Sequence, residues 1–316
     1  MKVSLLVKEL EDNLRGVLNG GGQPLDTEIT GIYYRSDRVK PGGLFVAVEG
    51  VKSDGHDFVG DAVSRGACAV VAQKPLDIGV PVVEVADSRY ALARLASAFW
   101  GHPSRRMKLI GVTGTNGKTT TAFLLDHILQ TAGFNTGVIG TVNYHYAGKT
   151  SRSGLTTPEA PDLQKILSEM AEAGVTHVIL EVSSHGISLE RIAGCRFAAG
   201  IFTNLSQDHL DFHGDMESYW AAKRRFFTDY IADFGKFAVI NIDDKKGREL
   251  YSVLTGLRKI SVGLNDAASV RASQLRFDQG GTSGRLYLEQ GSFPFHSALA
   301  GRFNLENLMC ASAAAC

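Results

Sequence analysis

A glycine-rich loop between an apolar run and an amphipathic segment constrains this chain more than any other feature. The loop reads Gly111-Val-Thr-Gly-Thr-Asn-Gly-Lys-Thr-Thr-Thr121 and follows the apolar residues Leu109 and Ile110. Apolar residues then recur at helical spacing from Leu124 to Leu129. A strand, a glycine turn and a helix start in this order form a phosphate-binding loop, in which backbone N–H groups surround an anion. The sequence therefore predicts a site for ATP or a related nucleotide.

The side chains of this loop also suit nucleotide phosphates. Lys118 supplies a positive charge for the β- and γ-phosphates, and the hydroxyl of Thr119 is a suitable ligand for Mg²⁺. The strict G-x-x-x-x-G-K-[ST] pattern has glycine where this chain has Val112, so the loop is a variant form. An ordinary glycine-rich turn is the alternative, and Gly-Lys-Thr in this setting disfavours it.

Composition favours a protein of the cytoplasm. The 316 residues carry 33 basic and 33 acidic side chains, which indicates no general attraction to nucleic acid or to an anionic membrane. No run approaches the ~18 apolar residues of a membrane span, and Lys8 and Glu9 come too early for a signal peptide. The four cysteines lack a C-x-x-C pair, which argues against zinc or a disulfide framework and fits a reducing compartment.

Alternating strand and helix patterns predict an α/β fold with two domains. Residues 1–104 form a small N-terminal α/β domain, and the polar segment 101–106 is the expected linker. Residues 105–316 form a P-loop-type central domain with a mostly parallel sheet, followed by a smaller antiparallel sheet. Leucines at positions 6, 10 and 14 predict an opening helix.

The predicted strands are residues 29–34, 44–48, 67–72 and 80–85 in the first domain, 109–113, 138–142, 175–182, 198–203 and 236–242 in the parallel sheet, and 270–277, 284–289 and 293–298 in the antiparallel sheet. The clearest predicted helices are residues 57–65, 88–99 and 215–227.

Three polar features follow the loop along the chain. Glu181 ends an apolar run, and nucleotide-hydrolysing folds place an acid near the metal at such strand ends; a plain surface glutamate is the alternative. Segment 203–214 holds two histidines, one of them His209, and two aspartates. A metal or catalytic role and a solvated polar loop both remain open for it. Lys223, on the next predicted helix, is usually a solvated charge on sequence grounds.

Two other segments carry side chains suited to ligands. Thr156 and Thr157 precede Pro158, which suits a first helical position, so their hydroxyls either cap that helix or hold a substrate. The residues alone favour the cap. Asn304 and Asn307 are three residues apart on a predicted helix start and share one face, where amide groups suit the edge of a base.

Together these motifs resemble the Mur ligase family, and within it the MurE type. The resemblance runs, in the family's order, through residues 113–121, 156–158, 181–186, 203–214, 219–223 and 301–307. It covers the first two of the family's three domains, and the Gly-Thr-Asn-Gly-Lys form of the loop accounts for the missing glycine at position 112. The resemblance implies that the family's C-terminal domain is absent, so that this chain is a truncated form with negligible turnover of its own.

The resemblance implies an ATP-dependent amide ligase of peptidoglycan precursor synthesis. ATP would phosphorylate the free carboxylate of UDP-MurNAc-L-Ala-D-Glu. The amino group of a diamino acid, meso-diaminopimelate or L-lysine, would then attack the acyl phosphate through a tetrahedral intermediate. Lys118 and Mg²⁺ would neutralise the phosphates and hold two anionic reactants together.

The family pattern also implies roles for individual residues. The implied catalytic residues are Lys118, Glu181, His209 and Lys223; the nucleotide contacts are Gly114, Thr115, Asn116, Gly117, Lys118, Thr119, Thr120, Asn304 and Asn307; the substrate contacts are Ser36, Thr156, Thr157, Ser183 and Arg191; and the Mg²⁺ ligands are Thr119, Glu181, His209 and Lys223 as a carbamate. Ser36 lies between Arg35 and Asp37, which exchange the acid and the base of the family's Asp-Ser-Arg motif. Residues 50–55 resemble the family loop that closes over the UDP moiety.

Two other functions remain open. A folylpolyglutamate synthetase shares the phosphate loop and the lysine, although the Val-Ser-Ser-His-Gly run and the extra N-terminal domain disfavour it. A nucleotide-dependent binding protein without ligase activity is the second, but a guanine-reading Asn-Lys-x-Asp is absent and His209 with Lys223 would lack a purpose. The residues indicate no oligomeric state.

Overall fold

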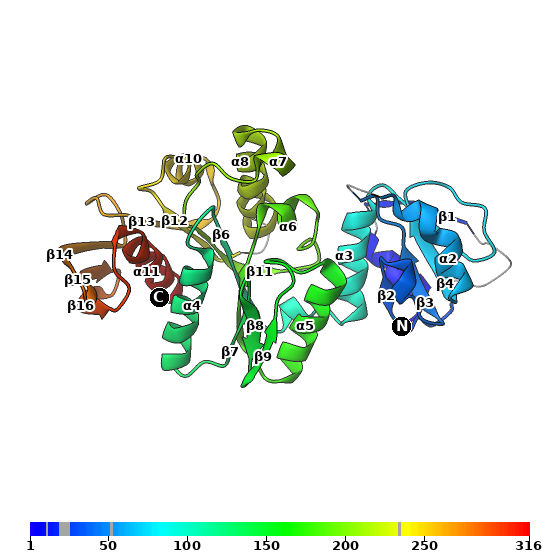
Figure 1. Cartoon of the computed structure of the whole chain (residues 1–316), viewed down its shortest axis with the longest axis horizontal. Helices are drawn as coiled ribbons and strands as arrows, with labels where there is room; N and C mark the ends of the chain where they lie inside the picture. The colour runs from blue at the N-terminus through cyan, green and yellow to red at the C-terminus, as the bar shows by residue number, and fades with distance from the viewer. Residues whose placement is uncertain (11, 19–25, 51–52, 233–234) are drawn as a thin grey trace. The chain divides into compact units, whose positions relative to one another are not determined.

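The computed structural model describes residues 1–10, 12–18, 26–50, 53–232 and 235–316, and the chain divides into two compact units (Figure 1). Unit 1 contains Met1–Pro103, Glu159–Ser168 and Leu189–Cys195. Unit 2 contains Ser104–Pro158, Glu169–Ser188 and Arg196–Cys316. Buried apolar clusters occur in each unit, so each has a hydrophobic core of its own.

Unit 1 is built on a sheet with the strand order β1-β5-β4-β3-β2. Strand β1 runs antiparallel to β5, and the other neighbours are parallel. The strands are β1 Leu14–Leu18, β2 Ile32–Tyr33, β3 Gly43–Val46, β4 Ala67–Ala72 and β5 Val82–Val85. The helices and short turns are α1 Val3–Val7, η1 Lys8–Leu10, η3 Ser36–Arg38, η4 Gly55–Phe58, α2 Val59–Ser64, α3 Ser88–Phe99 and η5 Pro103–Arg105.

Both faces of this sheet are covered, which explains why its inner strands read as continuous apolar runs. Alternate residues of β4 point to opposite faces, so Val71 packs with Leu92 and Leu95 of α3. Val70 packs on the other face with Ala62 of α2. Burial of each such aliphatic side chain stabilises the unit by about 1.5–3 kcal/mol.

The structure agrees with the sequence-based prediction for β4 and α3 and corrects the start of the chain. Asp87 is the N-cap of α3 and accepts hydrogen bonds from the backbone N–H groups of Arg89 and Tyr90. The predicted opening helix is wrong beyond Leu10, because Leu14 begins β1 and pairs with Val85. The leucine spacing fits a helix, but pairing with β5 satisfies the backbone groups of this segment.

Unit 2 is built on a sheet with the strand order β13-β12-β11-β6-β10-β7-β8-β9. Its strands from β13 to β7 in that order are parallel, and β8 and β9 extend the sheet as an antiparallel hairpin. The strands are β6 Lys108–Thr113, β7 Thr136–Ile139, β8 Asn143–Tyr146, β9 Lys149–Arg152, β10 His177–Glu181, β11 Phe197–Phe202, β12 Phe237–Asn241 and β13 Arg258–Val262. A separate antiparallel sheet consists of β14 Arg271–Asp278, β15 Gly281–Leu288 and β16 Gly291–Ser297. The mostly parallel sheet and the smaller antiparallel sheet confirm the predicted fold class.

Strand β6 shows how the two faces of the large sheet differ. Ile110 and Val112 face a cluster that includes residues of α4 Lys118–Thr131 and α11 Arg302–Ala315, which lie side by side (Figure 1). Gly111 points the other way, where a Cβ atom would overlap the ring of Phe226. Phe226 begins the π-helical turn η6 Phe226–Ile231, and its close approach to the sheet requires glycine at position 111. The other helices are α5 Ala160–Glu172, α6 Ser184–Ser188, α7 Leu210–His213, α8 Met216–Arg225 and α10 Lys245–Val253.

A buried carboxylate joins α4 to the edge of the sheet. Asp126 is 6% exposed and accepts hydrogen bonds from Thr136 of β7 and from Gln130. Gln130 donates to both carboxylate oxygens, and Oδ2 also lies 3.1 Å from Nε2 of His145 on β8. Burial by itself raises the pKa of Asp126, but the hydrogen bonds from His145 and Thr136 outweigh it and hold that pKa below its ordinary value. The network fixes the helix that follows the phosphate loop.

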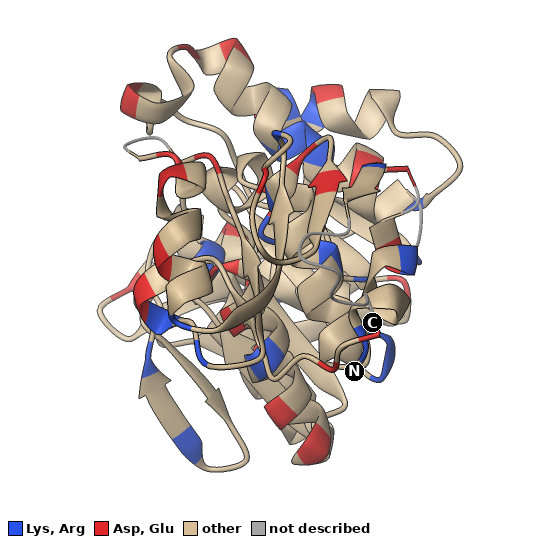
Figure 2. Ribbon diagram, turned by 90° about the vertical axis from the view of Figure 1, so that its right-hand side faces the viewer, with Lys and Arg blue, Asp and Glu red and all other residues tan. Residues whose placement is uncertain are grey.

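The distribution of charge and the apolar length of the helices can be read from the structure. Basic and acidic residues are interspersed along the ribbon (Figure 2), in line with the balance of 33 and 33. Among the residues that the structure describes, no helix has the length and apolar character needed to cross a bilayer.

Candidate functional site

The phosphate loop connects the end of β6 to the start of α4. Gly117 precedes the helix in the left-handed conformation with φ 85°, which favours glycine. Gly114 has φ 150°. A Cβ atom at Gly114 would overlap Oγ1 of Thr203, and one at Gly117 would overlap Oδ1 of Asn307. Both glycines are therefore required by backbone conformation and by close neighbours.

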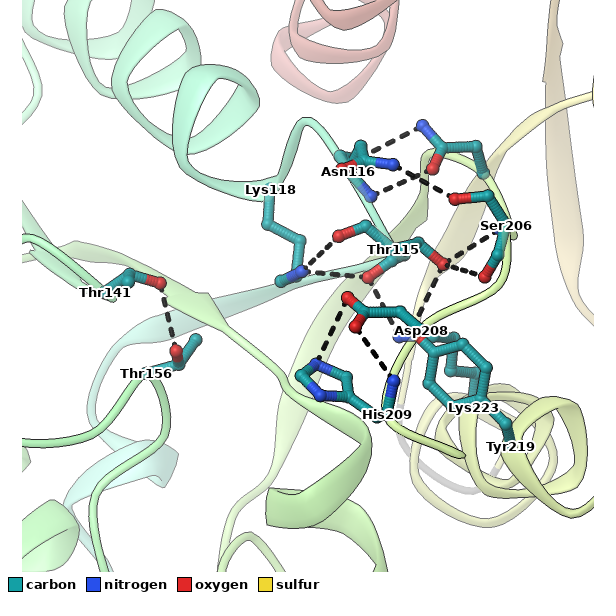
Figure 3. A network of polar contacts seen from close by, with 12 residues as sticks. Thr115, Asn116, Lys118, Thr141, Thr156, Ser206, Asp208, His209, Tyr219 and Lys223 are labelled. Carbon is teal, nitrogen blue, oxygen red and sulfur yellow. Dashed lines mark hydrogen bonds and ion pairs between the residues drawn. The ribbon is translucent and has the colours of Figure 1, made fainter. Parts of the chain in front are cut away.

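The ammonium group of Lys118 lies against the loop itself. Its Nζ donates to the carbonyl oxygens of Gly114 at 2.9 Å and Thr115 at 2.8 Å (Figure 3). Burial lowers the pKa of Lys118, and the carboxylates of Glu181 and Asp208 partly oppose that effect. The lysine carries a desolvated positive charge at the place where the fold presents backbone N–H groups, and this arrangement suits phosphate.

The outer side of the loop is held by the segment after β11. The backbone N–H of Asn116 donates to Oδ1 of Asn204 at 2.9 Å, and its side-chain amide donates to Oγ of Ser206 at 3.1 Å. The Thr115 hydroxyl accepts from the backbone N–H of Ser206 and lies 3.1 Å from the hydroxyl of Tyr219. The sequence assigned no role to Asn204, Ser206 or Tyr219, because their contacts with the loop depend on tertiary structure.

Glu181 ends β10, which lies between β6 and β7, and it is fully buried. Its carboxylate accepts from the hydroxyl of Thr119 at 2.9 Å and from the hydroxyl and backbone N–H of Thr141 at 2.9 and 3.1 Å. Gly140 leaves room for it, since a Cβ atom there would overlap the carboxylate. The structure thus brings Thr119 and Glu181 together and rules out the alternative of a surface glutamate.

The polar residues before α5 surround the same strand end. The hydroxyl of Thr156 lies 3.0 Å from that of Thr141 (Figure 3). Thr157 is fully buried, and its hydroxyl donates to the carbonyl oxygen of Glu181 at 2.8 Å. It also accepts from the backbone N–H of Ser183 at 3.0 Å. Thr157 and Ser183 therefore fix the backbone that follows Glu181, and their contact with substrate stays a prediction.

Lys223 is not the solvated lysine that its residue type alone favours. The side chain lies on α8, is 1% exposed, and donates from Nζ to the carbonyl oxygen of Gly114 at 2.8 Å. Its Nζ is 4.6 Å from the centroid of the Tyr219 ring. Burial and then repulsion from Lys118 lower the pKa of Lys223 well below its ordinary value, against the attraction of Asp208. A desolvated amine of this kind is a nucleophile when neutral.

His209 is placed close to this region, in an unusual backbone conformation. Its φ is 53°, its side chain is 43% exposed, and its Nε2 is 3.5 Å from the Asp208 carboxylate (Figure 3). Its ring and that of His185 form an edge-to-face contact with 4.9 Å between the ring centroids. Within the described residues, no hydrogen bond joins His209 to Glu181 or Lys223, and His, Cys, Asp and Glu form no metal-binding group of three or more.

The two asparagines of α11 differ in their surroundings. Asn307 is 6% exposed, lies against Gly117, and accepts from the hydroxyl of Thr121 at 3.3 Å. Asn304 donates to the carbonyl oxygen of Ala300 at 2.8 Å. A cavity of about 290 Å³ in this region has Phe303, 78% exposed, in its lining. The cavity is lined by Asn204, Asn241, Asp243, Asp244, Arg302, Phe303 and Glu306.

Unit 1 has a larger cavity of about 440 Å³, and Ser36 lines it. The flanking residues form an ion pair with each other, because the Arg35 guanidinium donates from Nε and Nη2 to the two oxygens of Asp37 at 3.0 and 2.8 Å. Arg191 is 9% exposed and lies 2.6 Å from Glu159, which also lines the cavity. Of residues 50–55, positions 51 and 52 lie outside the described residues.

Comparisons with known proteins agree with this geometry. The family described as the Mur ligase middle domain matches residues 112–315, and the Mur ligase family, catalytic domain, matches residues 28–100. A relative from Geobacter metallireducens, named UDP-N-acetylmuramoyl-L-alanyl-D-glutamate--2,6-diaminopimelate ligase, is 44% identical over 313 residues, which is 96% of this chain and 61% of the relative. The ligase of the same name from Geobacillus kaustophilus is 43% identical over 298 residues, 93% of this chain and 60% of that relative.

A solved structure of a ligase with this name has a TM-score of 0.80 and 30% identity, and the match covers 91% of this chain and 59% of that one. The chain therefore spans about three fifths of the length of these relatives. The middle-domain match alone covers well over half of the chain. By this match, the chain belongs to the Mur ligase family.

Proposed function

We propose that this chain carries the ATP site and the UDP-substrate site of a ligase that joins a diamino acid to UDP-MurNAc-L-Ala-D-Glu. The observation that carries the proposal is the contact of Thr119 and Glu181 beside the phosphate loop, together with the bonds of Lys118 and the buried Lys223 to the carbonyl oxygen of Gly114 in that loop. Residues 105–316 would bind ATP and residues 1–104 the uridine moiety. The relatives named as diaminopimelate ligases support this substrate, with meso-diaminopimelate as the favoured diamino acid.

The residues around Glu181 fit Mg²⁺. The ion prefers oxygen ligands, and the Glu181 carboxylate is surrounded by the hydroxyls of Thr119 and Thr141. Thr119 and Glu181 would hold the ion, which would neutralise phosphate charge when bound. In the family pattern His209 and a carbamate on Lys223 complete the metal ligands. The carbamate would form when the ammonium loses a proton, the neutral amine bonds to the carbon of CO₂ and a second proton is released to solvent, so that an anion replaces the buried cation.

The chain's own groups would act mainly through placement and charge. The Lys118 ammonium would leave the carbonyl oxygens of the loop and contact the β- and γ-phosphates. Asn307, beside Gly117, would contact the adenine, with Asn304 on the same helix. The γ-phosphoryl group of ATP would move to the substrate carboxylate and release ADP, and the amine of the diamino acid would then displace phosphate from the acyl phosphate. The reactants are metabolites of the cytoplasm, where the proposal places the protein.

Calorimetry with two non-reacting ligands tests this function. We expect the chain to bind UDP-MurNAc-L-Ala-D-Glu and the ATP analogue AMPPCP, and to bind no folate. Binding of folate in place of the UDP ligand would favour a folylpolyglutamate synthetase. Binding of AMPPCP with neither of the other two would favour a nucleotide-dependent protein that does no ligation. Absence of AMPPCP binding would contradict the assignment of the phosphate loop.

A further inference from the structure

Glu181 is a buried carboxylate that forms no ion pair with a basic side chain within the described residues. It is 0% exposed, and the donors to its carboxylate come from two threonines. Its Oε2 accepts from the hydroxyls of Thr119 and Thr141, both at 2.9 Å, and its Oε1 accepts from the backbone N–H of Thr141 at 3.1 Å. Buried charges in proteins are paired with an opposite charge or coordinate a metal ion. The carboxylate itself therefore points to a bound cation.

Thr141 holds this carboxylate by both oxygens, because its hydroxyl and its backbone N–H donate to different ones. Thr119 reaches only Oε2, so by itself it leaves the carboxylate free to rotate. Thr141 follows Gly140 just beyond the end of β7, and the absence of a side chain at Gly140 lets the carboxylate approach. The orientation of the carboxylate plane is thus set by Thr141.

The hydroxyl of Thr141 also lies 3.0 Å from the hydroxyl of Thr156 (Figure 3). A hydroxyl has one proton to donate, and an ionised carboxylate can only accept. The proton of Thr141 goes to Glu181, so Thr156 must donate to Thr141. Hydrogen bonds arranged in such a chain polarise one another. The polar segment before α5 therefore supports the bond from Thr141 to Glu181.

The side chain of Thr141 contributes little to packing. Thr141 is exposed, whereas Glu181 is fully buried. What the hydroxyl of Thr141 supplies is therefore its hydrogen bond to the carboxylate. A purely structural role of this bond would appear in the free energy of unfolding alone. A role in ligand binding would appear in the response of the protein to a cation.

We propose that Thr141 is a positioning residue that orients the Glu181 carboxylate as a ligand for Mg²⁺. Carboxylate and hydroxyl oxygens suit this ion. Groups that hydrogen-bond to a metal ligand fix its orientation, and their removal typically lowers metal affinity 10- to 100-fold. The inference rests on the proposed function, because that function places Mg²⁺ at Thr119 and Glu181.

Calorimetry of AMPPCP binding over a range of Mg²⁺ concentrations tests this role. The wild-type chain should bind AMPPCP more tightly when Mg²⁺ is added. Thr141→Val keeps the shape and the backbone N–H but removes the hydroxyl. The Mg²⁺ concentration that gives half of the gain in affinity should therefore rise about 10-fold, whereas AMPPCP affinity without Mg²⁺ should be unchanged. Thr141→Ser keeps the hydroxyl and should retain the wild-type response.

Thr150→Val is the matched control. Thr150 is exposed on β9, so its replacement should leave the response to Mg²⁺ unchanged. Urea unfolding checks the fold of each variant, and Thr141→Ala replaces Thr141→Val if the valine disturbs it.

An equal response to Mg²⁺ in the wild-type and Thr141→Val chains would overturn the proposal, whether or not the variant is less stable. A wild-type chain whose AMPPCP affinity does not respond to Mg²⁺ would instead contradict the metal ligands of the proposed function. A wild-type chain that binds no AMPPCP would contradict its nucleotide site.

Discussion

The phosphate loop of unit 2 and the cavity of unit 1 differ in how deeply the charged side chains around them are buried. Near the loop, Glu181 and Lys223 are 0% and 1% exposed, and each is held by hydrogen bonds. At the cavity, the side chains of Arg35 and Asp37 are 56% and 51% exposed. Burial strengthens the electrostatic interactions of a charged group but costs desolvation free energy, whereas solvent exposure weakens an ion pair. Substitutions at the loop should therefore change function sharply, and those at the cavity pair should not.

The largest effect is expected from Lys118→Ala. Removal of the ammonium takes away the positive charge that would contact the phosphates. AMPPCP affinity should therefore fall about 100-fold, and the fold should be retained. Calorimetry measures the affinity and thermal unfolding checks the fold. Lys149→Ala, at an exposed lysine of β9, should leave both unchanged. Equal AMPPCP affinity in the two variants would contradict the expectation that charge at the loop is needed for nucleotide binding.

Lys223→Met should separate stability from function. Methionine has a similar shape and no charge to desolvate, so the free energy of unfolding should stay the same or rise by about 1 kcal/mol. Ligation by a complete ligase that contains this chain should nevertheless fall about 100-fold if Lys223 supplies a metal ligand. Urea unfolding and phosphate release measure the two quantities. A loss of stability with full activity would assign Lys223 a purely structural role.

Asp126→Asn tests the buried network behind the loop through its pH dependence. The folded pKa of Asp126 lies below its ordinary value of 3.8, so its stabilising contribution is present above pH 3.8 and is lost as the pH falls through the folded value. At pH 7 the variant should lose about 1–2 kcal/mol of unfolding free energy. The difference from wild type should shrink towards pH 3. Urea unfolding at both pH values measures it, and an equal difference at both would exclude ionisation as the cause.

Asp37→Asn should have the smallest effect, and it tests whether the exposed ion pair at the cavity influences ligand binding. It removes the partner of Arg35 in a solvent-exposed ion pair, so the unfolding free energy should not change measurably. The released guanidinium adds positive charge to the cavity, and UDP affinity should rise about 2- to 5-fold. Asp229→Asn, which breaks a comparably exposed pair with Arg225, should leave UDP affinity unchanged. Weaker UDP binding in Asp37→Asn would show that the carboxylate itself contacts the ligand.

Regular, buried elements of this protein are readable from the sequence. Strand β4 and helix α3 match the predicted residues 67–72 and 88–99, because their apolar residues are buried at the spacing of their own secondary structure. Strand β9 carries only exposed polar residues and therefore has no apolar periodicity to detect. At the start of the chain the leucine spacing predicts a helix, but Leu14 belongs to β1, whose pairing with β5 no local pattern contains.

The candidate site divides in the same way. The glycine spacing and Gly-Lys-Thr predict the loop, because those residues act through local backbone conformation. The burial of Lys223 and the hydrogen bonds of Thr157 depend on strands that are distant in sequence, so no local pattern contains them. The cavity of unit 1 combines Arg89 with Glu159, and its charge pairing becomes visible only in three dimensions.

The close fit between Gly117 and Asn307 has a consequence for how the protein is made. The loop and the helix α11 that supports it are far apart in the sequence, and Thr121 and Asn307 are separated by 186 positions. A ribosome releases the loop early and its supporting helix late, at about 5–20 residues per second. The loop must therefore wait for roughly ten seconds or more before its last neighbour arrives. Until α11 docks, a nascent chain should bind nucleotide poorly, so ligand binding during synthesis would report completion of this unit.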